Sequence, residues 1–172
     1  MPPSILHPPS ALEINVVNRQ RVKTINVRWL RQITQAALAE LNVETAELGI
    51  TLLSARAMAQ LNWRYLQHEG ATDVITFDHS IAEVGARKAD RRLHGELFIC
   101  VDVAVAQANV FHTCWQAEVV RYVVHGILHL LGYDDTKPAL RRTMKRAENR
   151  LVRRLAAAFA LAKLSPPIRM VR

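Results

Sequence analysis

The sequence predicts an α/β (α+β) fold: one domain with a mixed sheet of about four strands, packed by about five helices. Its 172 residues fit a single ordinary domain, and 50% of them are hydrophobic, which is enough to form a sizeable core. Apolar residues alternate in some segments, as in strands, and recur every three or four residues in others, as in helices. These segments follow one another along the chain, and this order predicts the mixed fold.

The N-terminal half predicts two strand–helix pairs. Residues 11–17 alternate like a strand, and residues 46–53 predict a second one. Between them, residues 27–42 carry apolar side chains at helical spacing, namely Trp29, Leu30, Ile33, Ala37, Leu38 and Leu41. Ser54 can cap a second helix, because a serine side chain accepts hydrogen bonds from the free amides of a first turn. The apolar residues of that helix are Met58, Leu61, Trp63 and Tyr65, and we expect Trp63 to lie in the core.

Two more strands follow. Residues 72–77 (TDVITF) are rich in β-branched side chains, and residues 95–101 (GELFICV) predict the fourth strand. Asp102 is expected to cap the helix that comes next. A polar loop separates the two strands, and its basic residues are Arg87, Lys88, Arg91 and Arg92.

Two helices complete the predicted fold. Residues 116–131 form an apolar helix, which Gly132 should end because glycine readily adopts the left-handed conformation of a helix C-cap. Residues 138–163 predict the last helix, whose inner stripe is Met144, Ala147, Leu151, Leu155 and Phe159. Its other faces are strongly basic: Arg141, Arg142, Lys145, Arg146, Arg150, Arg153 and Arg154.

The ends of the chain and its cysteines predict the extent of the folded domain and the cellular location. Prolines make residues 1–10 a flexible arm, and residues 164–172 a similar tail, so residues 11–163 are expected to form the single folded domain. No segment reaches the roughly 18 apolar residues of a membrane span, and the N-terminus lacks the pattern of a secretory signal. Cys100 and Cys114 do not form a disulfide framework. We therefore expect a cytoplasmic protein with reduced thiols and no membrane partner.

The charge balance favours anionic partners. The chain has 23 Lys and Arg against 15 Asp and Glu, a formal net charge of +8. Such an excess is typical of proteins that bind nucleic acid or acidic membranes. A solvated basic surface without a specific partner is the alternative interpretation.

The stretch HGILHLLGYDD, residues 125–135, carries the strongest chemical signal. Residues four apart share one face of a helix, so His125 and His129 can present ring nitrogens to one ion. Gly132 then lets the chain turn back, and a residue from Tyr133 to Asp135 can supply a third ligand. The pattern therefore predicts a metal site.

The neighbours of the two histidines indicate which reaction such a metal would serve. Zinc with three protein ligands keeps an open position, where the pKa of a water falls towards about 7 and yields a nucleophile. Zinc proteases with H-E-x-x-H use the glutamate after the first histidine as general base, but here that position is Gly126. We therefore expect the metal-bound water to act without an assigned side-chain base. Together with the net charge, this favours a phosphodiester over a peptide substrate.

The chain resembles the YbeY family of bacterial metal-dependent endoribonucleases. The family signature H-G-x-L-H-L-x-G-Y-D-H is matched at His125, Gly126, Leu128, His129, Leu130, Gly132, Tyr133 and Asp134. Shorter matches are LN at 61–62, TDVITF at 72–77 and GEL at 95–97. The resemblance implies a zincin-like α/β fold and a zinc-type ion, one per chain. It also implies a role in maturation of the small-subunit ribosomal RNA 3′ end and in ribosome quality control. The implied partners are ribosomal RNA and the small ribosomal subunit, not DNA.

The chain departs from the family at two positions. The family's third ligand is the last histidine of the signature, and Asp135 stands there in this chain. Its carboxylate can bind zinc, so the ligand set implied is His125, His129 and Asp135, with Asp134 left as the alternative. The family also has an arginine six residues before the threonine of T-D-V, where this chain has Leu66, and Arg64 would face differently on a helix.

Four basic residues are the candidates for contact with RNA, and they are Arg64, Arg141, Arg142 and Lys145. Two other functions remain open besides an endoribonuclease. One is a different metal hydrolase, and the other is an RNA- or ribosome-binding factor with a structural ion. A fourth strong protein ligand would favour the binding factor, because structural zinc sites are closed by four ligands.

Overall fold

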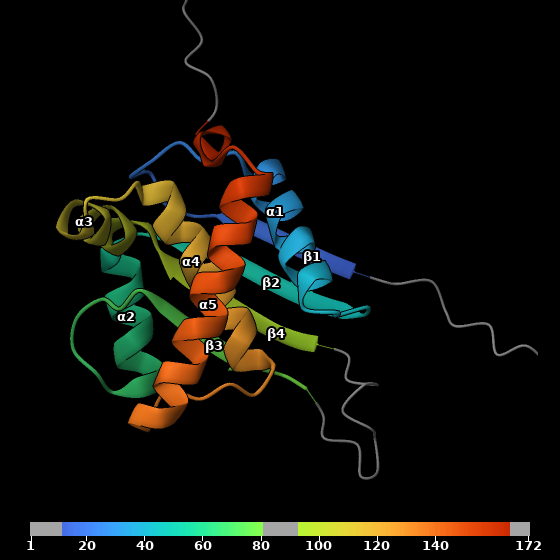
Figure 1. Ribbon diagram of the computed structural model, residues 1–172. Coiled ribbons are helices and arrows are strands. Elements are labelled where there is room, and N and C mark those ends of the chain that lie inside the picture. The colour runs from blue at the N-terminus through green and yellow to red at the C-terminus, as the bar shows by residue number, and fades with distance from the viewer. Residues whose placement is uncertain (1–11, 81–92, 166–172) are drawn as a thin grey trace, which may run out of the picture.

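The computed structural model describes residues 12–80 and 93–165, in which a four-stranded sheet is covered by helices (Figure 1). The strands are β1 (Leu12–Asn18), β2 (Ala46–Leu53), β3 (Val74–Asp78) and β4 (Leu93–Cys100). The helices are α1 (Val27–Glu40), α2 (Ala55–Leu66), α3 (Val101–Phe111), α4 (Trp115–Leu130) and α5 (Pro138–Ala158), followed by a short 3-10 helix at Leu161–Leu164. The predicted α/β class, with four strands and five α-helices in these ranges, is confirmed.

The sheet is mixed, as predicted, and has the strand order β1-β2-β4-β3. The pairs β1–β2 and β2–β4 are parallel, whereas β3 pairs with β4 in antiparallel orientation. Strand β4 therefore lies inside the sheet, and β3 forms one edge.

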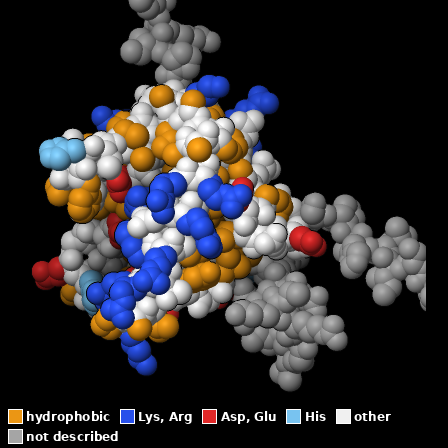
Figure 2. All heavy atoms as spheres, viewed as in Figure 1, with side chains coloured by type: hydrophobic (Ala, Val, Ile, Leu, Met, Phe, Trp, Pro, Cys, Tyr) orange, Lys and Arg blue, Asp and Glu red, His pale blue; other side chains and the backbone are white. Residues whose placement is uncertain are grey.

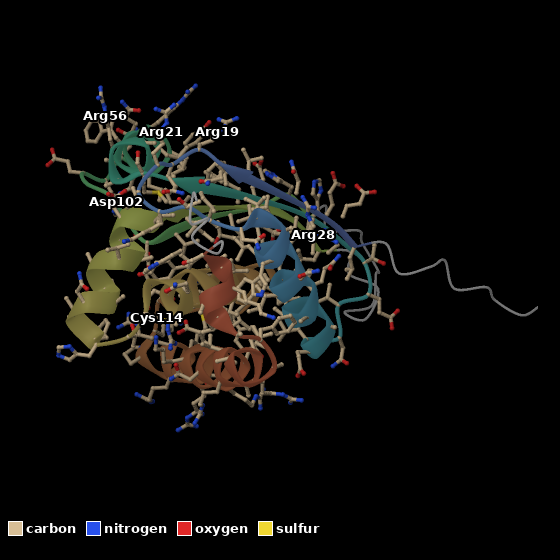
Figure 3. The ribbon with its side chains drawn as sticks, turned by 90° about the horizontal axis from the view of Figure 1, so that it is seen from above. Arg19, Arg21, Arg28, Arg56, Asp102 and Cys114 are labelled. Carbon is tan, nitrogen blue, oxygen red and sulfur yellow. The ribbon has the colours of Figure 1, made fainter. Side chains whose placement is uncertain are left out.

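Alternating side chains of β4 divide the interior into two cores. Leu97 and Ile99 belong to the larger core, which lies between the sheet and α1, α4 and α5. Phe98 and Cys100 belong to a smaller core on the other face, with Met58 of α2. This division follows from the period of two in a strand, which sends successive side chains to opposite faces. Figure 3 shows the sheet between α2 on one side and the main helical layer on the other.

Two expectations, for Asp102 and for Trp63, are wrong. Asp102 lies in the first turn of α3, where Cys100 is the N-cap residue, so Asp102 does not cap that helix. Its carboxylate instead accepts a hydrogen bond of 2.7 Å from the amide of Ala55, the first residue of α2 (Figure 3). Asp102 thus supports Ser54 in capping a neighbouring helix. Trp63, expected in the core, is 54% exposed. The residues that α2 buries are Met58 and Asn62.

Helix α4 crosses the main core in close contact with β4. A Cβ atom added at Gly126 would lie 2.4 Å from Cδ2 of Leu97, so a larger residue would force either the Leu97 side chain or α4 to shift. The glycine next to His125 therefore has a packing role. It allows close packing between β4 and the helix that carries both signature histidines.

The C-terminal boundary lies elsewhere than predicted. Helix α5 ends at Ala158, not at residue 163, because the backbone of Phe159 is extended. The chain then turns, and Leu164 is fully buried while its carbonyl accepts a 2.7 Å hydrogen bond from the amide of Asn26. The folded segment therefore includes Leu164, which the sequence placed in the tail. The predicted arm at 1–10, residues 81–92 with the basic side chains of the loop, and residues 166–172 of the tail lie outside the described residues.

The remaining expectations about the chain concern membranes and cysteines. Within the two described ranges, none of the helices combines the length and the apolar character that crossing a membrane requires. Cys100 and Cys114 are both free, as predicted. Burial raises the pKa of the Cys100 thiol, as expected for an unreactive core residue.

Candidate metal centre

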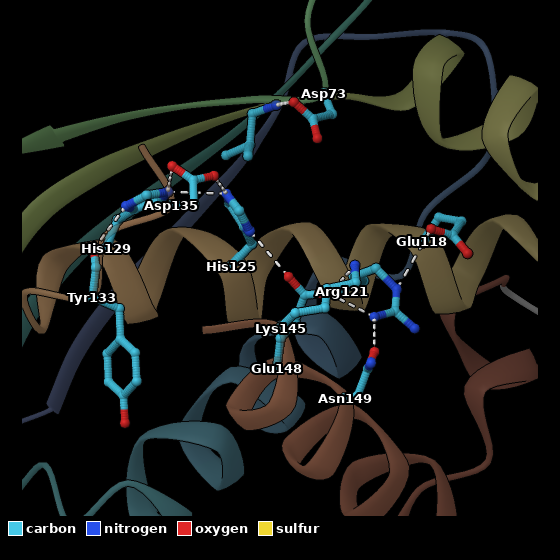
Figure 4. A network of polar contacts seen from close by, with 11 residues as sticks. Asp73, Glu118, Arg121, His125, His129, Tyr133, Asp135, Lys145, Glu148 and Asn149 are labelled. Atoms are coloured by element: carbon cyan, nitrogen blue, oxygen red, sulfur yellow. Dashed lines mark hydrogen bonds and ion pairs between the residues drawn. The ribbon is translucent and has the colours of Figure 1, made fainter. Parts of the chain in front are cut away.

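Two imidazole rings on α4 form the base of the site. His125 and His129 lie one turn apart, with ring centroids 4.6 Å from each other and nearly perpendicular planes. Their Nε2 atoms are 3.0 Å apart (Figure 4). Both side chains are partly buried, so the pair is accessible from one side.

The Nδ1 atoms of both rings face acceptors. Nδ1 of His125 lies 3.0 Å from Oε2 of Glu148, and Nδ1 of His129 lies 3.1 Å from the carbonyl oxygen of Tyr133. Because a carboxylate and a carbonyl can only accept, each Nδ1 carries a proton and donates it. Nε2 is then the nitrogen that each ring can offer to a metal ion, and the two Nε2 atoms face each other.

The turn after α4 brings the carbonyl of Tyr133 and the carboxylate of Asp135 to the histidines. Gly132 has φ +87°, the left-handed conformation that ends the helix as predicted. The two carboxylate oxygens of Asp135 each lie 3.9 Å from an Nε2, one from that of His125 and the other from that of His129. Nitrogen and carboxylate oxygen thus converge from a helix and the loop that follows it.

Asp134 faces a different way. Its two oxygens accept hydrogen bonds from the backbone amide and the hydroxyl of Thr136, both 2.8 Å long. These bonds lower the pKa of the exposed Asp134 carboxyl. Asp134 therefore shapes the turn, and the structure gathers Asp135 rather than Asp134 with the two histidines.

The three side chains fit a metal ion. One ligand atom from each of His125, His129 and Asp135 lies within 4.8 Å of the others, and no other such group occurs among the described residues. Around a tetrahedral zinc with bonds of about 2.0–2.1 Å, ligand atoms are roughly 3.3 Å apart. The 3.0 Å and 3.9 Å separations bracket this value, so one ion can lie within bonding distance of all three side chains after small shifts.

A buried carboxylate on α5 holds the first histidine in place. Glu148 is 2% exposed and accepts hydrogen bonds from His125, from Nη1 of Arg121 at 2.6 Å and from Nζ of Lys145 at 2.8 Å. Burial alone would raise its pKa, but these three donors outweigh burial and lower the pKa of Glu148 to about 2. Arg121 also donates to Asn149. The carboxylate therefore stays ionised and fixes the orientation of the ring.

A cleft of about 730 Å³ opens beside these residues. It extends from His125 and Asp135 to the end of α3, and both acidic and basic side chains line it. The residues that line it are Ala71, Thr72, Asp73, Val103, Gln107, Phe111, Glu118, Arg121, Tyr122, His125, Asp135, Arg141, Met144, Lys145 and Glu148. One oxygen of Asp73 accepts from Val74, and Figure 4 shows the other pointing into the space above α4.

The four predicted RNA contacts divide into two groups. Arg141 and Lys145 line the cleft, and Nε of Arg141 donates to the carbonyl oxygen of Asp135 at 2.9 Å. Arg64 and Arg142 do not line it, and the guanidinium of Arg64 lies over the ring of Tyr65 at 5.6 Å. Leu66, at the family's arginine position, is exposed at the last residue of α2.

The sequence interpretation missed Glu148 and Arg121. A signal for Glu148 was present, because the residue falls four positions after Met144 and three before Leu151, on the apolar stripe of α5. A carboxylate on such a stripe needs a partner inside the protein. Its partner, His125, is 23 residues away, and the sequence holds no signal for that pairing.

Comparison with known proteins shows similarity to one family. The model of the family described as "Endoribonuclease YbeY" matches residues 9–156. The Endoribonuclease YbeY of Parabacteroides distasonis is 32% identical over 122 residues, which cover 71% of this chain and 78% of the relative. That of Salinispora tropica is 36% identical over 128 residues, which cover 70% of this chain and 82% of the relative. That of Anaeromyxobacter dehalogenans is 41% identical over 126 residues, which cover 73% of this chain and 63% of the relative.

The fold also has a counterpart among solved structures. The solution structure of TM1509 from Thermotoga maritima superposes with a TM-score of 0.61 at 18% sequence identity. The match covers 92% of this chain and 99% of that one. At this identity the likeness shows a shared fold.

Proposed function

Because the chain belongs to the YbeY endoribonuclease family, a family of metal-dependent hydrolases, we propose that it cleaves single-stranded RNA in ribosomal RNA maturation. Its site would act near the 3′ end of the small-subunit RNA and in ribosome quality control, in the cytoplasm. The two relatives that are 32% and 36% identical to it over the aligned residues carry the name Endoribonuclease YbeY.

The observation that carries this proposal is the convergence of two Nε2 atoms and one carboxylate in an open cleft. Three protein ligands leave a coordination position free, which is the arrangement of catalytic rather than structural zinc sites. Within residues 12–80 and 93–165, no fourth candidate ligand joins the group. A binding factor with a closed structural ion is therefore the weaker alternative.

The ligands and their supports have separate tasks in this proposal. His125, His129 and Asp135 hold a zinc-type ion, and Glu148 and the carbonyl of Tyr133 keep the two rings in the orientation that the ion needs. When bound, the ion acts as a Lewis acid and lowers the pKa of a water in its open position towards about 7.

Basic side chains at the edge of the cleft would hold the RNA backbone. Arg141 is fixed by its bond to the carbonyl of Asp135, and within the described part of the chain its two terminal nitrogens have no acceptor. Lys145 is half exposed, so its ammonium can reach solvent and a phosphate as well as Glu148. Arginine and lysine in these positions would place a phosphodiester beside Asp135 and His125.

The test combines metal analysis with RNA cleavage. Purified protein is expected to contain about one ion per chain, to cut a single-stranded RNA that carries the small-subunit 3′ end, and to stop cutting after chelation. His129→Ala should lose metal and cleavage together, whereas His68→Ala, which changes an exposed histidine elsewhere, should keep both. Cleavage that persists at full rate in His129→Ala would contradict the proposal.

A further inference from the structure

The cleft reaches an aromatic side chain that the fold leaves uncovered. Phe111 is the last residue of α3, which ends there because His112 takes a left-handed conformation with φ 52°. The ring of Phe111 lines the cleft and is 65% exposed, although phenylalanine gains free energy when it is buried. No ring contact in the described part of the chain includes it.

Basic side chains of α5 line the same cleft as Phe111. Arg141 and Lys145 of α5 line it, and Figure 2 shows Lys and Arg side chains gathered along α5, with hydrophobic side chains over α3 beside them. The metal-centre residues His125 and Asp135 line the same cleft. One continuous hollow thus holds an aromatic face, cationic groups and the candidate ligands.

We propose that Phe111 is a stacking platform for one nucleobase of the RNA substrate, next to the phosphate held by Arg141 and Lys145. This inference rests on the proposed function and names a subsite of the same cleft. Every base has a flat π-face that can stack on an aromatic ring, whereas a phosphate needs a cation. A nucleotide requires both at once, and the lining of the cleft contains both.

The platform also gives a physical reason for single-stranded substrates. In a duplex both faces of a base are covered by its neighbours, so a base can reach Phe111 only after unstacking. A single strand exposes its bases at little cost. A protein partner would equally cover an exposed phenylalanine, but the adjoining cationic groups and candidate metal ligands favour a nucleotide in this position.

Binding of short single-stranded RNA to the full chain tests the platform. A chelator removes metal and prevents cleavage, and fluorescence anisotropy reports affinity for an oligonucleotide and for versions with one abasic position moved along it. Phe111→Ala should weaken binding at least about fivefold, since stacking of a base on an aromatic ring contributes about 1–3 kcal/mol. Phe111→Trp should keep the affinity, because tryptophan offers a larger face.

Two control variants match the substitution. Val110→Ala changes a neighbouring residue of α3 that is 66% exposed but does not line the cleft. Trp63→Ala removes an exposed aromatic ring from α2, which also lies outside the cleft lining. Both should bind RNA as the unmodified chain does.

The abasic series separates a stacking contact from a general loss. In the unmodified chain one abasic position should weaken binding, and Phe111→Ala should no longer distinguish that RNA from the intact one. Equal affinities of Phe111→Ala and Val110→Ala would overturn the platform, leave the proposed function standing and point to a protein partner for this end of α3. If the unmodified chain does not bind single-stranded RNA, the proposed function fails, and the platform fails with it.

Discussion

Two pairs of histidines lie ring to ring in this protein, and only one has the form of a metal centre. The ring centroids of His125 and His129 on α4 are 4.6 Å apart, and those of His79, next to the end of β3, and His94 of β4 are 5.4 Å apart. Both pairs have carboxylates beside them. Both pairs therefore have neighbouring imidazole rings and carboxylates, and these features do not distinguish the two sites.

The direction of the ring nitrogens is what differs. In the second pair, Nε2 of His79 lies 3.1 Å from Glu96, while Nε2 of His94 lies 3.9 Å from a different carboxylate, that of Glu47. The nitrogens diverge, and both side chains are more than 40% exposed. In the first pair, acceptors on Nδ1 turn both Nε2 atoms inward. A metal centre thus depends on the groups behind the ligands as much as on the ligands themselves.

The largest expected effect comes from removing one ligand of the converging pair. His129→Ala should reduce the metal content from about one ion per chain to near zero and cleavage more than about 100-fold, while alanine preserves the helix. His94→Ala makes the same change in the diverging pair and should keep metal and activity. Metal analysis by mass spectrometry and an RNA cleavage assay measure both. Normal metal content in His129→Ala would place the ion elsewhere.

The next effect distinguishes the two aspartates of the turn. Asp135→Ala removes the carboxylate that lies 3.9 Å from both Nε2 atoms and should weaken metal affinity by at least about 10-fold. Asp134→Ala loses only the bonds to Thr136 and should largely keep that affinity. Titration with Zn²⁺ against a competing chelator measures the difference. The opposite ranking would make Asp134 the third ligand.

A change behind the ligands tests the central point of the comparison. Glu148→Gln keeps the shape of the side chain but removes the charge that faces His125, Arg121 and Lys145. We expect a loss of about 10- to 100-fold in metal affinity although no ligand has changed. Glu96→Gln removes the carboxylate beside His79 and should leave affinity unchanged. Equal affinities of the two variants would mean that the buried carboxylate does not orient the ring.

The smallest effect concerns folding of the metal-free chain in acid. The three donors hold the pKa of Glu148 at about 2 against an ordinary value of 4.5, so the folded state favours the ionised form. Its contribution of about 3 kcal/mol is present above pH 4.5 and is lost as the pH falls from 4.5 towards 2. Urea unfolding with chelator should therefore show the unmodified chain and Glu148→Gln approaching each other in stability over this range. A constant difference down to pH 2 would contradict the assignment.

The sequence determined the local features of this molecule. Alternation and helical spacing predicted the four strands and the helices, and Gly132 marked the end of α4. The spacing of His125 and His129 was sufficient to predict that they share a face, because helix geometry depends only on positions in the chain. Asp135 could be placed near them, since the turn after α4 is only a few residues long.

Only the tertiary structure decided what lies behind and beside those ligands. Glu148 reaches His125 from α5, Asp102 caps α2 from α3, and Phe111 of α3 lines the same cleft as residues of α4 and α5. Trp63 matched the helical pattern, yet among the described residues it is 54% exposed. Periodicity describes one element at a time, whereas these contacts depend on how helices pack against a shared sheet. The sequence therefore predicted the candidate ligands, and packing between elements decided their orientation and the shape of the cleft around them.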